Sequence, residues 1–289
     1  MFTPTPAPLC RIDGPVLISV EARVNGPLER TLKQKTAGYG PALAAQVVRL
    51  LRWRGDFVMD LHAGDLLRIL FSDEQGPELQ ALSYQGEQIQ LQAYRYTDSR
   101  GLTDFYDAEG LTIAPRLVRA PVPDYEQITE TVQSGKGRRK HNGLDVKAPT
   151  GTPVILPFAG RVVRVNWHER VNGRSIEVVY AAEGRPSVSA FFLHLHMVQR
   201  HVRPGVYLEA GVPLGTVGCT GRCGAPHLHY EIRAPDGTPV DPFNFHGSRQ
   251  GKVTDAERAA FLALRDRYAR QLEGESAEAD NQWPPVDTR

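Results

Sequence analysis

Three separated groups of residues carry the side chains that a hydrolytic metal site requires. Each group contains histidine, and the groups are His141-Asn-Gly-Leu-Asp145, His194-Leu-His196 and His227-Leu-His229. Eight of the nine histidines lie between positions 141 and 246. Imidazole and carboxylate are typical ligands of catalytic zinc, and three protein ligands leave a fourth position for the water that does the chemistry. The question is whether these groups can meet in space.

Strand periodicity predicts that the last group presents its histidines together. Side chains alternate between the two faces of a strand. A strand over 227–232 therefore places His227, His229 and Glu231 on one face. The opposite face receives three large apolar side chains and is expected to be buried. A row of imidazoles on the polar side of a half-buried sheet is a suitable metal platform.

The same reasoning applied to 191–197 predicts that His194 and His196 share one face of a second strand. The opposite, buried face is expected to hold the apolar residues of this segment, which are Phe191, Leu193, Leu195 and Met197. Both strands are thus expected to bury an apolar face and to present imidazoles from the other.

The first group can join them, because His141 and Asp145 are an even number of residues apart and Gly143 permits a turn or a close approach. A single histidine on a strand is more often an ordinary polar residue than a ligand, so the three groups together carry the hypothesis. The remaining histidines have no paired context and are expected to be ordinary polar residues; they are His62, His168, His201 and His246.

Composition limits the possible partners. The chain has 289 residues, which favours about two domains. Its 34 Lys and Arg balance 33 Asp and Glu, and no long basic stripe is present, so nucleic acid is not expected as a partner. No apolar run approaches the roughly 20 residues of a membrane span. The first residues lack the features of a signal peptide, so the protein is expected either to be cytoplasmic or to have its export signal upstream of this sequence.

The pattern along the chain predicts an α+β protein that is mostly β. Residues 1–120 are expected to form an accessory or regulatory α+β domain with antiparallel strands and a helix over 42–53 that covers one face. Its strands are expected over 17–24, 66–71, 79–84, 89–96, 102–106 and 111–113.

Residues 121–248 are expected to form a compact β domain that begins at a linker, Pro121-Val-Pro-Asp124. Its strands are expected over 152–157, 160–167, 175–180, 187–195, 213–217 and 228–233. Residues 249–289 are expected to form a helix, announced by the capping pair Thr254 and Glu257, and a polar, disordered tail from Gly274.

The second half resembles the lysostaphin/LytM-type zinc peptidases. The likeness covers about residues 125–245 and rests on three blocks in the family's order. The blocks are His141-Asn-Gly-Leu-Asp145 with Ala148-Pro-Thr-Gly-Thr-Pro-Val154, then Phe192-Leu-His-Leu195, then Gly221-Arg with Pro226-His-Leu-His-Tyr-Glu231. The resemblance implies the family's antiparallel β-sheet fold, the duplicated hybrid motif, which is β-roll-like. More weakly, Trp53–Arg68 and Tyr106-Asp-Ala-Glu-Gly110 resemble the domain that precedes the catalytic one in Gram-negative cell-wall D,D-endopeptidases.

The resemblance implies a role for each residue of the site. His141, Asp145 and His229 would be the ligands of Zn²⁺, and His194 and His227 would be the catalytic pair. Spacing alone does not choose His229 over His227, or His194 over His196. The sequence also does not say which of the catalytic imidazoles acts as the base.

Four further residues in or near these blocks have open interpretations. His196 stands where the family usually has a small polar residue and could compete for a role. Cys219 and Cys223 could form a disulfide that rigidifies the loop before the last strand, and this is favoured over two buried thiols because the family works outside the cytoplasm. Glu231 could hold a ring N–H of His229 or be a solvated carboxylate.

The function implied by the resemblance is a zinc endopeptidase that hydrolyses the peptide cross-links of peptidoglycan, with D-alanyl–meso-diaminopimelate as the expected bond. The location is then periplasmic or elsewhere in the cell envelope, and a monomer is favoured. The main alternative is a non-catalytic LytM-type regulator that activates a cell-wall amidase, but retention of the five site residues argues against it. A carbohydrate-binding β domain with incidental histidines is a third possibility.

Overall fold

The computed structural model describes residues 16–36, 38–55, 61–74, 76–132, 140–180 and 187–274. The chain divides into two compact units, of which the first comprises the described parts of Met1–Arg95, Asp107–Glu109 and Arg258–Arg289. The second comprises those of Tyr96–Tyr106 and Gly110–Glu257. The boundaries of these units differ from those expected from the sequence, which divided the chain into 1–120, 121–248 and 249–289. One reason is that the C-terminal helix groups with the N-terminal strands.

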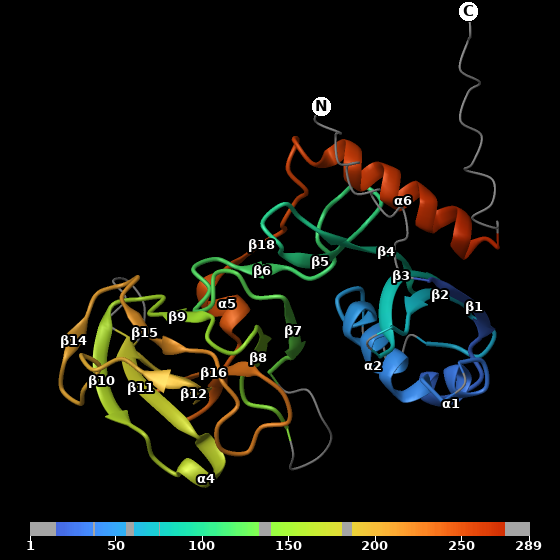
Figure 1. Cartoon of the computed structure of the whole chain (residues 1–289). Coiled ribbons are helices and arrows are strands. Elements are labelled where there is room, and N and C mark those ends of the chain that lie inside the picture. The colour runs from blue at the N-terminus through green and yellow to red at the C-terminus, as the bar shows by residue number, and fades with distance from the viewer. Residues whose placement is uncertain are drawn as a thin grey trace, which may run out of the picture. The chain divides into compact units, whose positions relative to one another are not determined.

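The first unit is built on antiparallel strands in the order β1-β2-β3-β4. Its elements are β1 (Ile18–Arg23), α1 (Leu28–Lys33), α2 (Gly40–Leu51), β2 (Leu66–Ser72), β3 (Glu78–Gln85), β4 (Gln90–Thr97) and α6 (Arg258–Leu272). Helix α2 contacts β3, and α6 contacts β1, β2 and β3. The two helices lie on opposite sides of the sheet (Figure 1), and β3 is accordingly buried over six consecutive residues.

The expected helix and strands of this unit are present with small shifts at their ends, but helix α1 was not predicted from the sequence. Helix α6 begins at Arg258, four residues after Thr254. The hydroxyl of Thr254 donates a hydrogen bond to the Glu257 carboxylate, so the two residues of the capping pair do meet. The apolar face of α6 is buried at Phe261, Tyr268 and Leu272. The tail expected to be disordered lies outside the described residues.

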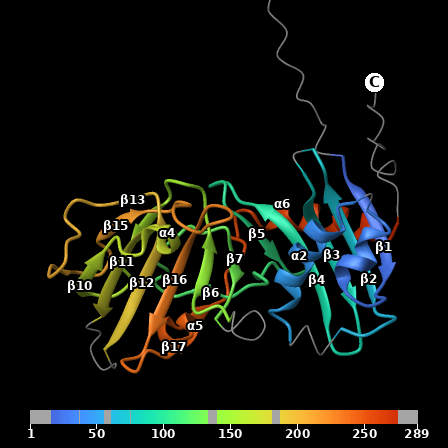
Figure 2. The same cartoon turned by 90° about the horizontal axis from the view of Figure 1, so that it is seen from below.

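The second unit contains the larger sheet, whose strands run in the order β14-β10-β11-β12-β16-β8-β7, with β17 paired to β16. Its paired strands are antiparallel, and β11, β12 and β16 lie side by side in the view of Figure 2. The bounds are β7 (Gln127–Glu130), β8 (Leu144–Lys147), β10 (Gly160–Val165), β11 (Arg174–Tyr180), β12 (Val188–Leu195), β14 (Tyr207–Leu208), β16 (His227–Arg233) and β17 (Pro239–Val240).

Smaller elements complete this unit. A three-stranded sheet has the order β13-β15-β9, a two-stranded sheet pairs β18 with β6, and the segment expected as a strand over 111–113 forms only isolated bridges. The bounds are β5 (Thr103–Tyr106), β6 (Arg116–Leu117), β9 (Pro153–Ile155), α4 (Glu169–Asn172), β13 (Met197–Val198), β15 (Pro213–Thr216), α5 (Pro242–His246) and β18 (Ser248–Arg249). None of the helices in the described part of the chain has the length and apolar character that crossing a bilayer needs.

One face of the large sheet forms the core of the second unit. The fully buried side chains of its central strands include Leu144, Val146, Ile176, Val178, Ala190, Phe192, Leu228, Tyr230 and Ile232. Phe158 and Phe245 extend this core through edge-on and stacked contacts with Tyr180. The mostly β, antiparallel fold class expected from the sequence is confirmed. The other face of the same sheet carries the histidines.

Candidate active site

Strands β16 and β8 bring the first two site residues together. His229 and Asp145 are cross-strand partners in the antiparallel pair. Directly opposed residues of such a pair project to the same face, with their Cβ atoms about 5 Å apart. His227 lies two residues earlier on β16 and shares that face. The expected alternation of this strand is confirmed, since Leu228, Tyr230 and Ile232 are fully buried on the other face.

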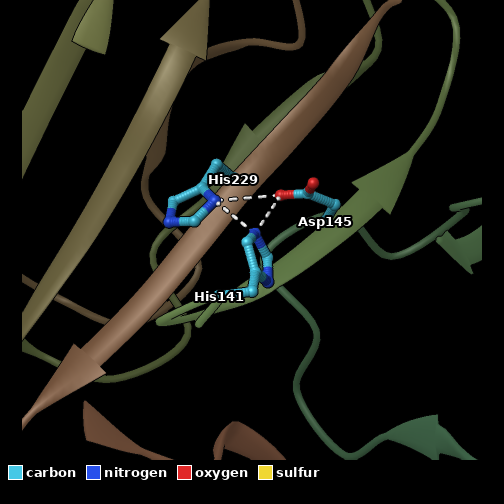
Figure 3. A group of neighbouring side chains, drawn as sticks. All are labelled: His141, Asp145 and His229. Carbon is cyan, nitrogen blue, oxygen red and sulfur yellow. Dashed lines mark hydrogen bonds and ion pairs between the residues drawn. The ribbon is translucent and has the colours of Figure 1, made fainter. Parts of the chain in front are cut away.

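His141 reaches the same place from the segment before β8. The chain passes over β16 at Gly143, where a Cβ atom would collide with the carbonyl oxygen of Tyr230. Glycine is therefore required for this close approach. The turn lets the imidazole of His141 fold back onto the face that holds Asp145 and His229 (Figure 3).

The three side chains converge on one point. His141 Nε2 lies 3.1 Å from Asp145 Oδ1 and 3.1 Å from His229 Nδ1, and the last two atoms are 2.9 Å apart. Two imidazole nitrogens and a carboxylate oxygen form a donor set suited to a divalent metal ion. Their separations suit a shared small cation, because zinc ligands lie about 2.0–2.2 Å from the ion.

The ionisable side chains of this group shift one another's pKa values. Burial opposes protonation of His229, but its hydrogen bonds to Asp145 and Glu231 outweigh burial and raise its pKa to about 9. Burial likewise opposes ionisation of Asp145, yet the two imidazoles hold its pKa well below the ordinary value. The carboxylate is thus ionised under all ordinary conditions, as a metal ligand must be.

The imidazoles of His141 and His229 each have a second partner on the ring nitrogen that faces away from the group. His141 Nδ1 lies 3.2 Å from the carbonyl oxygen of Thr131, which can only accept. His229 Nε2 lies 3.6 Å from Glu231 Oε2, and the other oxygen of that carboxylate accepts from Arg233 Nε. Such partners fix the tautomer and the ring orientation of a ligand histidine.

His194 reaches the site face by a route that the sequence analysis did not foresee. The prediction that Phe191, Leu193, Leu195 and Met197 form the buried face of β12 was wrong: the core face holds Val188, Ala190 and Phe192, while Phe191, Leu193 and Met197 are half-buried or exposed. Strict alternation would then turn His194 into the core.

The backbone of His194 breaks the alternation of β12. Its φ of 66° lies in the left-handed region, which is costly for a residue with a Cβ atom. The break turns the imidazole toward the site face and leaves the next residue, Leu195, fully buried. Conformational strain is therefore located at a predicted catalytic residue, as is common at functional sites.

His194 and His227 face one another beside the group formed by His141, Asp145 and His229. Their ring centroids are 5.0 Å apart, and His227 Nε2 lies 3.6 Å from Asp145 Oδ1. His194 Nδ1 is 2.9 Å from the carbonyl oxygen of Thr220, and His227 Nδ1 is 2.7 Å from that of Ala225. Because carbonyl oxygens only accept, each Nδ1 carries the proton, and Nε2 of the neutral ring has a lone pair to offer.

Burial lowers the pKa of His194 below the ordinary value of a histidine. This imidazole, which is only 8% exposed, is therefore neutral near pH 7. A neutral imidazole can accept a proton from water or donate its own N–H to a developing negative charge. The pair His194 and His227 can therefore accept a proton from water and donate an N–H to a developing negative charge.

His196 does not join the group. It follows the end of β12, its side chain is exposed, and its carbonyl oxygen accepts from the guanidinium of Arg174. The histidine at 246 is more than an ordinary polar residue: it is buried, and its ring links the Tyr230 hydroxyl (2.8 Å) to the carbonyl oxygen of Val118 (3.1 Å). It lies on the core side of the sheet and supports β16 from behind.

Cys219 and Cys223 form a disulfide in the loop that precedes β16. The favoured interpretation of these two cysteines is confirmed. Sequence reasoning did not find the carbonyl groups of Thr131, Thr220 and Ala225 that orient the imidazoles. No side-chain pattern marks a backbone acceptor.

Comparison with known proteins identifies a peptidase family and several peptidases that resemble this chain. Residues 139–242 match Peptidase family M23. The peptidoglycan DD-endopeptidase ShyA of Vibrio cholerae is 28% identical over 255 residues, which is 84% of this chain and 56% of that relative. Lysostaphin of Staphylococcus staphylolyticus is 28% identical over 145 residues, 47% of this chain and 29% of that protein. The chain thus spans little more than half of the first relative.

One solved structure that resembles the chain is a zinc-containing peptidase from Vibrio cholerae. It is 24% identical, covers 78% of this chain and 70% of its own, and superimposes with a TM-score of 0.38.

Proposed function

Because residues 139–242 form a domain of Peptidase family M23, we propose that this protein is a zinc-dependent endopeptidase that hydrolyses the peptide cross-links of bacterial peptidoglycan. The bond that we propose is D-alanyl–meso-diaminopimelate. Relatives that align with more than four fifths of this chain are named peptidoglycan DD-endopeptidases.

The observation that carries this proposal is the convergence of two imidazoles and one carboxylate beside a second pair of imidazoles. His141, Asp145 and His229 would hold the ion, with donor atoms 2.9–3.1 Å apart. His194 and His227 would act on the substrate. When bound in such a site, zinc lowers the pKa of water to about 7 and polarises a carbonyl group.

The chain's own residues would perform the proton transfers. With Nδ1 protonated, Nε2 of His194 or of His227 can take the proton of the attacking water. The ring that has taken this proton becomes a donor, and it can then stabilise the developing oxyanion or pass the proton to the leaving amine. Such acid–base help contributes typically about 10²–10⁴-fold.

We place the protein in the periplasm or elsewhere in the cell envelope, where its substrate lies. The disulfide between Cys219 and Cys223 supports this location, because disulfides persist in oxidising compartments. The N-terminal part of the chain, over 1–120, is proposed to position the wall substrate or to regulate access to the site. A monomer is the proposed state.

The test is digestion of purified cross-linked muropeptides by the full chain. Zinc-loaded protein should release the two monomers by cutting the D-alanyl–meso-diaminopimelate bond. A chelator should abolish this, and added zinc should restore it. Products that result from cleavage of a different bond in the muropeptide would correct the substrate assignment.

Absence of turnover with every muropeptide, in protein shown to hold zinc, would contradict the endopeptidase proposal. The regulator alternative is not favoured, because the five residues proposed for the site are all present and lie close together.

A further inference from the structure

The loop between β15 and β16 supplies the hydrogen-bond acceptors of both proposed catalytic histidines. It runs from Gly218 to His227, whose backbone atoms pair at its base (3.1 Å from N to O). Between these residues the loop is mostly exposed, and its backbone makes two isolated hydrogen bonds, from Thr220 N–H to the His194 carbonyl oxygen (3.4 Å) and from Arg222 N–H to the Val171 carbonyl oxygen (3.0 Å). Such a segment is not rigid by itself, so the orientation of its carbonyl groups depends on specific restraints.

The acceptor of His194 is held by side-chain hydrogen bonds. The hydroxyl of Thr220 donates to the carbonyl oxygen of Leu195 (2.8 Å) and accepts from the backbone N–H of Arg174 (2.8 Å). Gly173 and Gly221 pass so closely here that a Cβ atom on either would collide with backbone. Thr220 is therefore anchored to β11 and β12, and its carbonyl oxygen stays aimed at His194.

The acceptor of His227 lies in the other half of the loop, where this anchor does not reach. Ala225 is exposed, and two residues before it stands Cys223, whose sulfur lies 3.7 Å from His227 Nδ1. The disulfide to Cys219 ties this half to the residue next to the anchored Thr220. Covalent closure of this short ring restricts the position of Cys223, and through it the positions that Ala225, two residues later, can adopt.

We propose that the Cys219–Cys223 disulfide and the Thr220 hydroxyl are two separate positioning devices for the catalytic imidazoles. The hydroxyl holds His194 through the carbonyl of Thr220, and the disulfide holds His227 through the carbonyl of Ala225. This inference rests on the proposed function for the roles of His194 and His227. The metal ligands are outside the loop and do not depend on either device.

The test compares Cys219→Ser/Cys223→Ser with Thr220→Val, using the full chain loaded with zinc. Long-range ¹H–¹⁵N spectra of the imidazoles report which ring nitrogen carries the proton. His194→Gln and His227→Gln assign the signals. In the wild type both rings should be Nδ1–H tautomers. The cysteine double variant should show a mixed or broadened His227 signal with His194 unchanged, and Thr220→Val should show the reverse.

Activity is the second measurement. Misplacing a catalytic group by about 1 Å costs on the order of 100-fold in rate. Each variant should therefore lose between about 10- and 100-fold in kcat, with KM and zinc affinity within about twofold of wild type. Thr220→Ser, which keeps the hydroxyl, should restore kcat and the His194 signal. Cys10→Ser serves as the control for removal of a cysteine.

Unchanged spectra and unchanged kcat in the double cysteine variant would overturn the role of the disulfide. So would mass spectrometry of alkylated, active protein that finds both thiols free. If zinc-loaded wild type cleaves no muropeptide, the proposed function fails instead, and the tautomer spectra still decide whether the loop holds the two rings.

Discussion

Strand β16 and the end of β12 deliver histidines to the same site in different ways. On β16, His227 and His229 project from a regular strand whose opposite face is fully buried. On β12, the regular alternation would bury His194, and a left-handed φ of 66° turns it to the site face instead. One proposed metal ligand, His229, thus comes from relaxed backbone, whereas one proposed catalytic residue, His194, comes from strained backbone.

The difference shows what each region is built to do. Cross-strand pairing of His229 with Asp145 fixes these two proposed ligands relative to one another on regular backbone. His194 gains its place only because the surrounding hydrogen bonds, including that to Thr220, hold a conformation that the residue alone would avoid. The two regions should therefore respond differently to substitution.

The largest effect is expected from Asp145→Ala. It removes the only carboxylate among the three proposed ligands, so zinc should be lost, and kcat/KM should fall at least about 10³-fold. Glu126→Gln, at a half-buried carboxylate paired with Lys147, is the matched control and should keep full activity. The measurement is turnover of a cross-linked muropeptide after zinc loading. Wild-type activity in Asp145→Ala would refute the ligand assignment.

His194→Gln and His227→Gln should each lower kcat by about 10²–10⁴-fold, because each removes an acid–base group. Both variants should bind zinc with wild-type stoichiometry. Steady-state kinetics and metal analysis of the same samples provide the check. If one of these variants lost its zinc, the substituted histidine would be a metal ligand rather than a catalytic residue.

Glu231→Gln should weaken zinc binding by about 10–100-fold, since the carboxylate that faces His229 Nε2 would lose its charge. Glu177→Gln is the control, because Glu177 lies in the same cross-strand row, opposite Phe191, but away from the ligands. Competition with a chelating dye measures both affinities. Equal affinities in the two variants would show that Glu231 has no such role.

The pH dependence of zinc binding follows from the raised pKa of His229. Its raised pKa of about 9 means that the metal-free ring carries a proton below that pH, and zinc must displace it. Affinity should therefore fall about tenfold per unit as pH decreases from 9 to 7. Calorimetry in buffers of different ionisation enthalpy should detect the released proton at pH 8. Zinc binding without proton release would contradict the pKa and its cause.

The pKa shifts of His229 and Asp145 also make the stability of the zinc-free protein depend on pH. A raised pKa means that protonated His229 stabilises the folded state fully below its ordinary pKa of about 6.5, and that this contribution is lost as pH rises through about 9. Asp145 has a lowered pKa, so its contribution is present above its ordinary value and is lost in acid.

The smallest expected effect concerns the difference in backbone conformation between His194 and His227. His194→Asn should keep the stability of the fold, because asparagine tolerates the left-handed region. His194→Ile should cost about 1–2 kcal/mol more in the free energy of unfolding. At His227, on a regular strand, isoleucine should be tolerated. Urea unfolding of the metal-free variants measures this, and equal costs of isoleucine at both positions would remove the contrast.

The same contrast explains what the sequence could predict. Period-two alternation identified the face shared by His227, His229 and Glu231, because β16 is regular and one of its faces is apolar. It misassigned the faces of β12, because Phe191 and Leu193 are apolar but lie on the site side and because no residue pattern announces a positive φ at a histidine. The choice of His229 and His194 over their neighbours required the family resemblance.

Local structure was predicted well where hydrophobic periodicity is strong, as in α2 and β3. Helix α1 was missed because its six residues are too short for a periodic signal. Likewise the tertiary partners of the imidazoles, such as the carbonyl groups of Thr220 and Ala225, depend on how a loop is closed, which composition does not encode.

Zinc titration of wild type, His229→Ala and His227→Ala, with the bound metal measured after gel filtration, tests the central claim most directly. One ion per chain in wild type and in His227→Ala, and none in His229→Ala, is the predicted result. Loss of the ion in His227→Ala with retention in His229→Ala would contradict the assignment of ligand and catalyst on β16.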